Sequence, residues 1–386
     1  MKKKMIFGAG FYGQKAFERY GADEVEYFID NDKDKTGSLV CGKKVITPER
    51  AAGMRDDYHI VIASLYAESM SQQLDALGVT DYSFFISPVH GMFETDELVL
   101  NPYISNPEAD SEKNWNEAKK LEYSRKEVNR MTERLHANQP LFDHIEVETV
   151  NRCNGVCGFC PVSKNADTRE YAKMSEKLFR DIVGQLEEIQ YSGRFTTFSN
   201  NEPLLDERII DFNIYAREHL PKARMHLYTN GTLLTLDKFL ALTDVLDELV
   251  IDNYQQELKL IKPCQEIKEY CEAHPELELN KKVTILLRKP QEILTSRGGD
   301  APNRHDLMEY PDDRCVLPFR QMIIRPTGKV SLCCNDALGK FTLGDASKDK
   351  LVDIWYGAQF SKVRECLYEG RANWGNCKYC DTFITG

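Results

Sequence analysis

Short apolar runs alternate with helical patterns in the first part of the chain. The apolar runs lie at residues 5–8, 25–30, 58–64 and 82–87. Each has the length and composition of a strand, and residues 11–21 follow a glycine turn with a helical pattern. Because strands that alternate with helices form parallel sheets, residues 1–90 are predicted to be a small α/β domain.

A polar, strongly charged segment follows this domain. Residues 88–138 lack the strand-like runs of the first domain and are rich in Glu, Lys, Asn and Arg. This composition predicts one or two exposed helices. We therefore assign residues 91–140 to a helical linker.

The alternation of apolar runs and helices resumes on a larger scale from residue 143. Strands are predicted at residues 144–150, 195–206, 225–231, 248–254 and 281–289. Residues 174–189 form an amphipathic helical pattern, and further helices are expected between the later strands. Polar residues repeatedly follow the strands, at the C-terminal strand ends where α/β barrels place their functional sites.

Composition and charge exclude several classes of protein. The 386 residues suffice for two or three domains, and the apolar and charged fractions are those of a globular chain. A net charge of −11 argues against a broad nucleic-acid-binding surface. No run approaches the roughly 20 apolar residues of a membrane-spanning helix, and the glycine-broken start is too short for a signal peptide. The sequence predicts a cytoplasmic protein with no nucleic-acid or membrane partner.

Twelve cysteines are unusual in such a chain, because cytoplasmic thiols are kept reduced rather than paired in disulfides. Three of them lie between residues 153 and 160, and six lie between residues 315 and 380. Clusters of this kind indicate ligation of a metal ion or an iron–sulfur cluster.

The first cluster, "CNGVCGFC", places Cys153, Cys157 and Cys160 in one loop after a predicted strand. Three thiolates can hold three irons of a cubane and leave the fourth iron open to a small chelating ligand. Structural zinc usually takes four protein ligands, and the nearest upstream histidine, His144, is at the far end of the strand. A zinc site and plain buried thiols are the alternatives to an iron–sulfur cluster.

The spacing C-x3-C-x-aromatic-C, with Phe159 as the aromatic residue, resembles the signature of the radical S-adenosylmethionine (SAM) superfamily. This resemblance implies a partial (β/α)6 barrel over residues 141–300, with Phe159 near the cofactor. It implies a [4Fe–4S] cluster whose open iron binds SAM, and an electron donor such as flavodoxin or ferredoxin. In this family the cleavage of SAM gives a 5′-deoxyadenosyl radical, which abstracts a hydrogen atom from the substrate.

Residues 200–203 resemble the G-G-E-P strand end of the same superfamily, which contacts the amino group of SAM. The four residues are Asn200, Asn201, Glu202 and Pro203, so two asparagines stand where glycines are usual. Asparagine tolerates unusual backbone angles, and the turn is therefore expected to form. The alternative interpretation makes Glu202 a solvated loop acid.

Two further strand ends match positions that hold SAM in relatives. Asp252 and Asn253 stand where relatives bind the SAM ribose. Arg288 could pair with the SAM carboxylate through two parallel hydrogen bonds. The alternative for all three residues is an exposed position without a ligand.

The second group of cysteines lies near the end of the chain. Cys315 and Cys333 flank a predicted hairpin, and Cys377 and Cys380 form a C-x2-C pair. Spacing alone fits a second iron–sulfur cluster or a zinc ribbon equally well. The order of these motifs resembles the SPASM/twitch extension of radical SAM enzymes, which implies a second, auxiliary [4Fe–4S] cluster over residues 301–386. The few residues after Cys380 leave room for only the one-cluster twitch form.

Cys334 competes with Cys333 as a ligand of the auxiliary cluster. Adjacent strand residues face opposite ways, so only one of the two thiols should point at the cluster. A glycine five residues before Cys333 matches the G-x4-C spacing of the extension and favours Cys333.

The one-cluster layout resembles enzymes of the 2-deoxy-scyllo-inosamine dehydrogenase type, which oxidise an alcohol of an aminocyclitol. The resemblance implies that the auxiliary cluster accepts an electron from a substrate radical. Arg297, eighteen residues before Cys315, lies close to the position of an active-site arginine of that enzyme type. Arg297 would orient the substrate hydroxyl and stabilise a developing oxyanion; the alternative is an exposed loop arginine.

The glycine turn "GAGFYG" contributes Gly8, Gly10 and Gly13 between a strand and a helix, and Asp30 ends the next strand. This context suits a phosphate at a helix N-terminus, although tight structural turns also select glycine. The first domain resembles the Rossmann-like domain fused to sugar acetyltransferases and sugar methyltransferases. The resemblance implies a nucleotide-sugar ligand and hence a small, sugar-linked substrate.

These inferences predict a radical SAM oxidoreductase that oxidises or otherwise modifies a sugar, sugar nucleotide or cyclitol, with an auxiliary cluster as electron acceptor. A radical SAM enzyme that modifies a peptide or protein is the main alternative. A metal-stabilised binding or scaffold protein without turnover is a third possibility.

Overall fold

The computed structural model describes residues 2–64, 67–79, 82–85, 111–279 and 282–383. The chain divides into two compact units, Met1–Gly91 and Met92–Gly386. Among the described residues, no helix is both long enough and apolar enough to cross a bilayer.

The N-terminal unit is a six-stranded sheet with helices. Its described elements are β1 (Lys3–Phe7), α1 (Phe11–Tyr20), β2 (Val25–Ile29), β3 (Leu39–Val40), β4 (Lys43–Ile46), α2 (Pro48–Ala52), β5 (Tyr58–Ile62), α3 (Ala67–Ala76) and β6 (Tyr82–Phe84). The strand order is β3-β4-β2-β1-β5-β6, and all pairs are parallel except β3 with β4. The predicted parallel α/β arrangement is confirmed, whereas the short antiparallel β3–β4 pair was not predicted.

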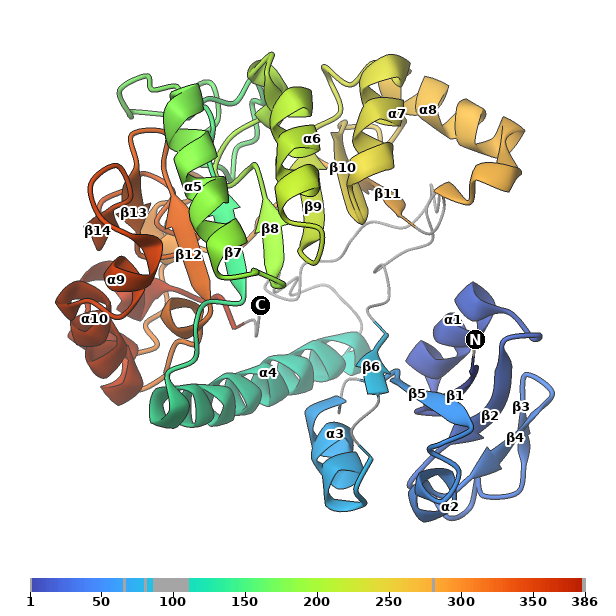
Figure 1. Ribbon diagram of the computed structural model, residues 1–386. Helices are drawn as coiled ribbons and strands as arrows, with labels where there is room; N and C mark the ends of the chain where they lie inside the picture. The colour runs from blue at the N-terminus through green and yellow to red at the C-terminus, as the bar shows by residue number, and fades with distance from the viewer. Residues whose placement is uncertain (1, 65–66, 80–81, 86–110, 280–281, 384–386) are drawn as a thin grey trace. The chain divides into compact units, whose positions relative to one another are not determined.

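The C-terminal unit is larger and also of α/β type (Figure 1). Its helices are α4 (Ser111–Asn138), α5 (Glu176–Glu188), α6 (Ile209–His219), α7 (Leu236–Val245), α8 (Lys262–Ala273), α9 (Leu351–Trp355) and α10 (Ala358–Glu369). Its strands are β7 (His144–Val147), β8 (Arg194–Thr196), β9 (Arg224–Thr229), β10 (Glu248–Tyr254), β11 (Val283–Arg288), β12 (Gln321–Ile324), β13 (Lys329–Ser331) and β14 (Gly344–Asp345). Short 3-10 turns make up the remaining regular structure, including η1 (Pro203–Leu205), η2 (Pro275–Leu277), η4 (Arg297–Gly299), η5 (Leu317–Phe319), η6 (Arg371–Asn373) and η7 (Gly375–Tyr379).

One twisted sheet organises this unit. The strand order is β11-β10-β9-β8-β7-β12-β13-β14, and the strands from β11 to β12 are all parallel. Helices α5 to α8 connect β7 to β11 in sequence, which is the succession of an α/β barrel. The sixth parallel strand, β12, pairs with β7 rather than with β11, so the barrel remains open between β11 and β12. Antiparallel β13 and β14 then extend the sheet beyond β12.

The two faces of this sheet differ in chemistry. On β7, Ile145 and Val147 are fully buried in the apolar core that also contains the helix residues Phe179 and Ile182. Successive strand residues face opposite sides, so His144, Glu146 and Glu148 all lie on the other face. The face of the sheet opposite the helices is therefore lined by buried polar groups on this strand.

Helix α4 is a single helix. It was predicted to be exposed, but one of its sides is buried. Val128 and Leu135 are buried in the apolar core, and the helix contacts α10. Arg125 of α4 forms a two-pronged hydrogen-bonded ion pair with Asp313, at 2.6–2.9 Å. Because of these contacts, α4 is part of the C-terminal unit rather than an exposed spacer.

Candidate active site

The loop after β7 brings Cys153, Cys157 and Cys160 together. A methyl group placed on Gly155 would lie 3.3 Å from Cys153 Sγ and 3.8 Å from Cys157 Sγ, so both sulfurs border the same space. Burial raises the pKa of Cys153 to about 11 and that of Cys157 to about 12, and the neighbouring thiols add to both effects. Three adjacent thiolates would repel one another unless a cationic group neutralises them. This donor set fits an iron–sulfur cluster.

The loop is fixed by contacts from several strand ends. Gly158 N–H donates to Pro290 O at 2.8 Å, after β11. Asn230, after β9, donates to Asn154 Oδ1 at 2.8 Å and points its amide toward Cys153 Sγ at 3.9 Å. The thiols are therefore held by the barrel and not only by their own loop.

The predicted G-G-E-P equivalent joins two strand ends. Glu202 is 1% exposed and accepts hydrogen bonds from Thr229 Oγ1 at 2.7 Å and from Asn230 N–H at 2.7 Å. Burial raises its pKa, which these donors partly counter. Pro203 opens the turn η1. Glu202 thus connects β8 to the residue that faces Cys153, and the solvated-acid alternative does not describe its position.

The two asparagines before Glu202 occupy different environments. Asn201 Oδ1 accepts from Ser199 N–H, and Asn201 Nδ2 is buried with no hydrogen-bond partner among the described residues. Asn200 donates to Cys334 O at 3.0 Å and to Ser199 Oγ at 3.2 Å. Asn200 therefore joins the end of β8 to the second cysteine group.

The ends of β10 and β11 place Asp252, Tyr254 and Arg288 beside the cysteine loop. Arg288 Nη1 is 3.6 Å from Asp252 Oδ1, and Arg288 also donates to Glu292 Oε2 at 2.9 and 3.1 Å. The ring of Phe159 lies 5.7 Å from the ring of Tyr254. Burial raises the pKa of Asp252 and that of Tyr254. The structure thus brings the predicted residues Phe159, Asp252 and Arg288 together.

Asn253 does not join them. Its amide donates to Lys259 O at 2.9 Å and accepts from Ile261 N–H at 2.8 Å, and its side chain is fully buried. Neighbouring Asp252 faces the other side of β10. Asn253 therefore holds the loop before α8, and we leave it out of the proposed SAM site.

Three cysteines of the second group line a small cavity. A cavity of about 40 Å³ is lined by Cys333, Cys377 and Cys380. Burial raises the pKa of Cys333 well above its usual value, and Cys334, Cys315, Cys380 and Cys377 contribute further. No three His, Cys, Asp or Glu side chains in the described part of the chain surround one point as ligands of a single ion. The cysteines of a cubane bind separate irons, and this donor set fits one.

Cys333 and Cys334 face different surroundings. The cavity is lined by Cys333 and not by Cys334. Burial raises the pKa of the Cys334 thiol to about 12, and the largest charged influences on it are Glu146 and Arg297. We therefore keep Cys333 as the proposed ligand, with Cys334 turned toward Arg297.

Arg297 lies beside this junction. Its guanidinium donates to Cys334 O at 3.3 Å and to Asn200 Oδ1 at 3.5 Å. Its backbone has φ +51°, a left-handed conformation that is uncommon for a residue with a side chain. Such conformations cluster at functional sites, where the surrounding structure holds them in place. The exposed-loop alternative does not describe Arg297.

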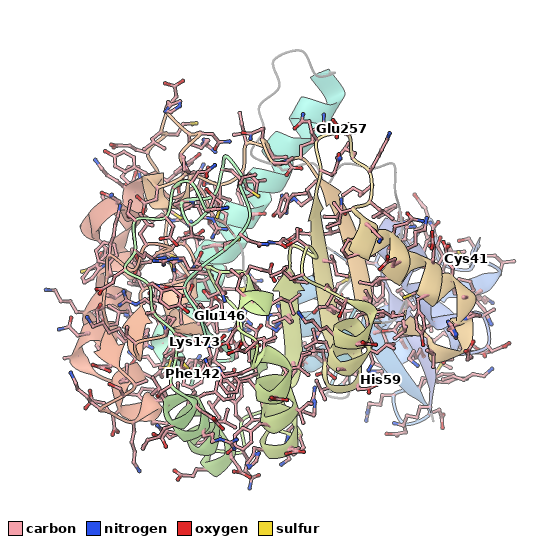
Figure 2. The ribbon with its side chains drawn as sticks, turned by 90° about the horizontal axis from the view of Figure 1, so that it is seen from above. Cys41, His59, Phe142, Glu146, Lys173 and Glu257 are labelled. Carbon is pink, nitrogen blue, oxygen red and sulfur yellow. The ribbon has the colours of Figure 1, made fainter. Side chains whose placement is uncertain are left out.

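Glu146 is a site residue that the sequence analysis missed. It is 6% exposed and accepts a hydrogen bond from Ser199, which lies next to Asn200. Burial raises its pKa to about 7, and Arg297 is close enough to counter part of that shift. Figure 2 shows Glu146 among the side chains in the middle of the C-terminal unit. The available signal was the alternation "HIEVE", which places two acids on one face of a buried strand.

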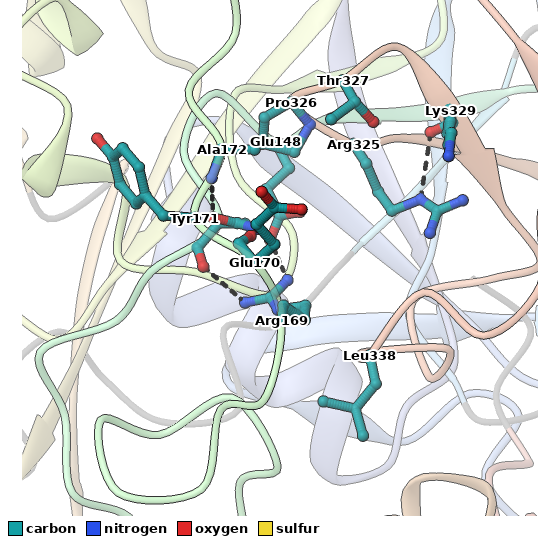
Figure 3. A pocket seen from close by; sticks show the side chains of 11 residues that line it. Glu148, Arg169, Glu170, Tyr171, Ala172, Arg325, Pro326, Thr327, Lys329 and Leu338 are labelled. Atoms are coloured by element: carbon teal, nitrogen blue, oxygen red, sulfur yellow. Dashed lines mark hydrogen bonds and ion pairs between the residues drawn. The ribbon is translucent and has the colours of Figure 1, made fainter.

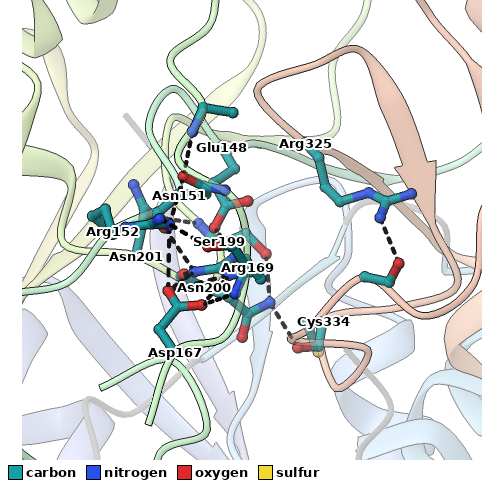
Figure 4. Close-up of polar contacts among 12 residues, drawn as sticks. Glu148, Asn151, Arg152, Asp167, Arg169, Ser199, Asn200, Asn201, Arg325 and Cys334 are labelled. Carbon is teal, nitrogen blue, oxygen red and sulfur yellow. Dashed lines mark hydrogen bonds and ion pairs between the residues drawn. The ribbon is translucent and has the colours of Figure 1, made fainter. Parts of the chain in front are cut away.

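A second buried acid, Glu148, anchors a polar network (Figure 4). Arg169 Nη1 donates to Glu148 Oε1 at 3.0 Å, and Arg169 also binds Asp167 at 2.9 Å. The same guanidinium donates to Asn200 O at 2.9 Å. Burial raises the pKa of Glu148 to about 7, which Arg169 partly counters. This network ties the β7 end to the residue that contacts Arg297.

In the N-terminal unit, the glycine turn is tightly packed. A methyl group on Gly13 would lie 1.7 Å from Gly8 O, and Gly8 has φ +116°. Asp30 Oδ2 accepts from Ala9 N–H at 3.0 Å, so this carboxylate closes the turn. Gly10 caps α1 without a side-chain hydrogen bond. The structural-turn alternative accounts for Gly8 and Gly13, and nucleotide binding remains a prediction.

Comparisons with known proteins cover the C-terminal unit. Residues 147–254 match the radical SAM superfamily, and residues 315–381 match the SPASM iron–sulfur cluster-binding domain. A curated relative from Niallia circulans, described as an S-adenosyl-L-methionine-dependent 2-deoxy-scyllo-inosamine dehydrogenase, is 28% identical over 245 residues. The match covers 62% of this chain and 93% of that protein.

A solved structure gives the same result for the fold. The crystal structure of BtrN in complex with AdoMet and 2-DOIA matches with a TM-score of 0.55 and 26% identity, over 63% of this chain and 94% of that one. Radical SAM domains use SAM and a [4Fe–4S] cluster, and SPASM domains hold auxiliary iron–sulfur clusters. The chain carries both domains and is a radical SAM enzyme with a C-terminal SPASM domain.

Proposed function

We propose that this enzyme oxidises a secondary alcohol of an aminocyclitol or related sugar to a ketone. The observation that carries the proposal is the position of Arg297, which lies between the β8 end near the SAM-type cysteine loop and the second cysteine group. The relative from Niallia circulans is described as a dehydrogenase of such a cyclitol. The buried polar face of the sheet suits a hydroxylated substrate.

The proposed reaction divides the two hydrogens of the alcohol between two acceptors. Bound cofactors would supply the radical chemistry: the 5′-deoxyadenosyl radical would take the carbinol hydrogen atom and become 5′-deoxyadenosine, and the auxiliary cluster would take one electron. Cys153, Cys157 and Cys160 would hold the first cluster, and Cys315, Cys333, Cys377 and Cys380 the second. The hydroxyl proton then remains to be removed by the protein.

Two side chains are suited to removing the hydroxyl proton. The guanidinium of Arg297 would hold the hydroxyl oxygen and stabilise its negative charge as the proton leaves. Glu146 is a buried carboxyl group whose raised pKa is partly lowered by the charge of Arg297, and we assign it the role of accepting the proton. Asn200 and Ser199 would position both groups, because they connect Arg297 to Glu146.

SAM would be bound by the ends of the barrel strands. We assign its amino group to Glu202 and Asn201, its carboxylate to Arg288 and its ribose to Asp252, with Phe159 packing nearby. The same proposal includes flavodoxin or ferredoxin as the electron donor that reduces the first cluster. A nucleotide or sugar nucleotide at Gly8, Gly10 and Gly13 would make the N-terminal unit a binding domain for sugar-linked compounds.

The direct test is an anaerobic assay with 2-deoxy-scyllo-inosamine and related cyclitols and sugars. Reconstituted enzyme with SAM and dithionite should form 5′-deoxyadenosine and a keto product in equal amounts. Formation of neither across this set, with turnover of a peptide instead, would replace the proposal with the peptide-modifying alternative.

Replacing Arg297 tests its proposed role. Arg297→Lys keeps a positive charge but loses the planar pair of donors, and we expect kcat for the keto product to fall about 10²- to 10³-fold, as for loss of an oxyanion-stabilising donor. The KM should change less than kcat, because the contact strengthens as charge develops. Arg180→Lys, on the exposed surface of α5, is the matched control. Unchanged kcat in Arg297→Lys would contradict the assignment.

The pH dependence tests Glu146. A proton acceptor must be ionised, and burial raises the pKa of Glu146 to about 7. Formation of keto product should therefore rise with pH through about 7 and level off above it. Glu146→Gln should lower the rate and remove this rise. A Glu146→Gln enzyme with the wild-type pH profile would show that another group takes the proton.

A further inference from the structure

A second cavity opens beside this site (Figure 3). Its volume is about 390 Å³, within the range of small-molecule sites. One wall is the segment 169–172 from the long loop after β7, and the other is the turn 325–329 between β12 and β13. The cavity therefore lies between the radical SAM domain and the SPASM domain.

Hydrogen bonds link the inner wall of the cavity to the proposed reaction centre. Glu148 and Arg169 line it, and Arg169 Nη2 donates to Asn200 O at 2.9 Å. The side-chain oxygen of the same asparagine accepts from Arg297 at 3.5 Å. Asn200 thus connects the cavity wall directly to the arginine that we assign to the reacting hydroxyl.

The buried carboxyl group of the lining, Glu148, can accept a hydrogen bond from a hydroxylated or cationic ligand. Glu148 is 2% exposed, and Arg169 divides its donors among Glu148, Asp167 and backbone oxygens. Arg325 is turned toward Gly339 O and Thr342 Oγ1. A phosphate would have to approach the buried Glu148 carboxyl, whereas an amine or hydroxyl can donate to it.

The rim completes a surface suited to a sugar ring. Tyr171 is 60% exposed at the rim and offers an aromatic face and a hydroxyl. Lys329 and Glu170 also line the opening and add one donor group and one acceptor group. Carboxylate, ammonium and aromatic groups together match the donors, acceptors and apolar faces of an aminated sugar.

We propose that this cavity is a second substrate subsite, which binds a hydroxylated, amine-bearing ring joined to the ring that is oxidised. This inference rests on the proposed function and makes it more specific. The preferred substrate would then be a two-ring compound, with the amine of the outer ring at Glu148 and the reacting hydroxyl of the inner ring at Arg297.

The test compares a one-ring and a two-ring probe on the anaerobically reconstituted full-length enzyme with SAM bound. The probes are 2-deoxy-scyllo-inosamine and paromamine, which joins a glucosamine ring to a diaminocyclitol, and binding is measured by calorimetry. We expect paromamine to bind about tenfold more tightly or better, the effect of one charge-assisted hydrogen bond. Glu148→Gln should bring the affinity ratio near one.

A second variant tests the subsite independently, in case Glu148→Gln does not fold. Thr327→Trp fills the rim from an exposed turn and should also bring the affinity ratio near one. Lys348→Trp, an exposed position that does not line the cavity, should keep the ratio of the wild type. If the one-ring probe binds and paromamine binds no better, the subsite is wrong while the proposed function stands. If neither probe binds, both the subsite and the proposed function are wrong.

Discussion

Cys157→Ala is expected to abolish cleavage of SAM. Removal of a partner that only hydrogen-bonds to a metal ligand costs about 10- to 100-fold in activity, so loss of a ligand itself should cost about 10³-fold or more. The chain would also lose one [4Fe–4S] cluster, so bound iron should fall from about eight to about four atoms per chain. Both quantities are measured on anaerobically purified protein, as 5′-deoxyadenosine formed and as iron content.

The matched control for this variant is Cys41→Ser. Cys41 is an exposed thiol of the N-terminal unit, outside both cysteine groups. This change should leave iron content and SAM cleavage at wild-type values. Normal SAM cleavage by Cys157→Ala would mean that the loop does not hold the reactive cluster.

Cys377→Ala is expected to separate SAM cleavage from product formation. Cys377 lines the cavity of the second cysteine group, and this variant keeps all three thiols of the first loop. Without the auxiliary electron acceptor, the substrate radical cannot complete its oxidation. We expect 5′-deoxyadenosine to form still, while keto product falls about 10²-fold or more, a loss comparable to that of a group needed for the chemical step.

Cys366→Ala is the control for Cys377→Ala. Cys366 lies on α10 and does not line the cavity. The Cys366→Ala enzyme should form 5′-deoxyadenosine and keto product in wild-type yields. If Cys377→Ala forms keto product as fast as the wild type, the auxiliary cluster is not the electron acceptor in this reaction.

The features that the sequence predicted best depend on local spacing. Cys153, Cys157 and Cys160 fall in one short loop, so their convergence follows from the sequence itself. Most strands of both units were predicted because their apolar runs are short and regular, whereas β3, β4 and β14 were not predicted. The pairing of β12 with β7 was not predicted, because it joins residues far apart in the chain.

The features that were missed depend on contacts between distant segments. Glu146 and Arg297 are far apart in sequence, and only the folded sheet makes them neighbours. The buried side of α4 was hidden by a charged composition, since Val128 and Leu135 are isolated apolar residues among polar ones. Asn253 was assigned to SAM because relatives bind the SAM ribose at this strand end, but strand alternation turns it away from Asp252.

The central claim is that a carbinol hydrogen of a cyclitol leaves as an atom and an alcohol becomes a ketone. The most direct measurement uses 2-deoxy-scyllo-inosamine that carries deuterium on its carbinol carbons, with the reconstituted enzyme, SAM and dithionite. The account predicts one deuterium in each 5′-deoxyadenosine and one keto product for each deuterium transferred. Turnover that leaves all deuterium in the product, or that yields 5′-deoxyadenosine without deuterium, would contradict it.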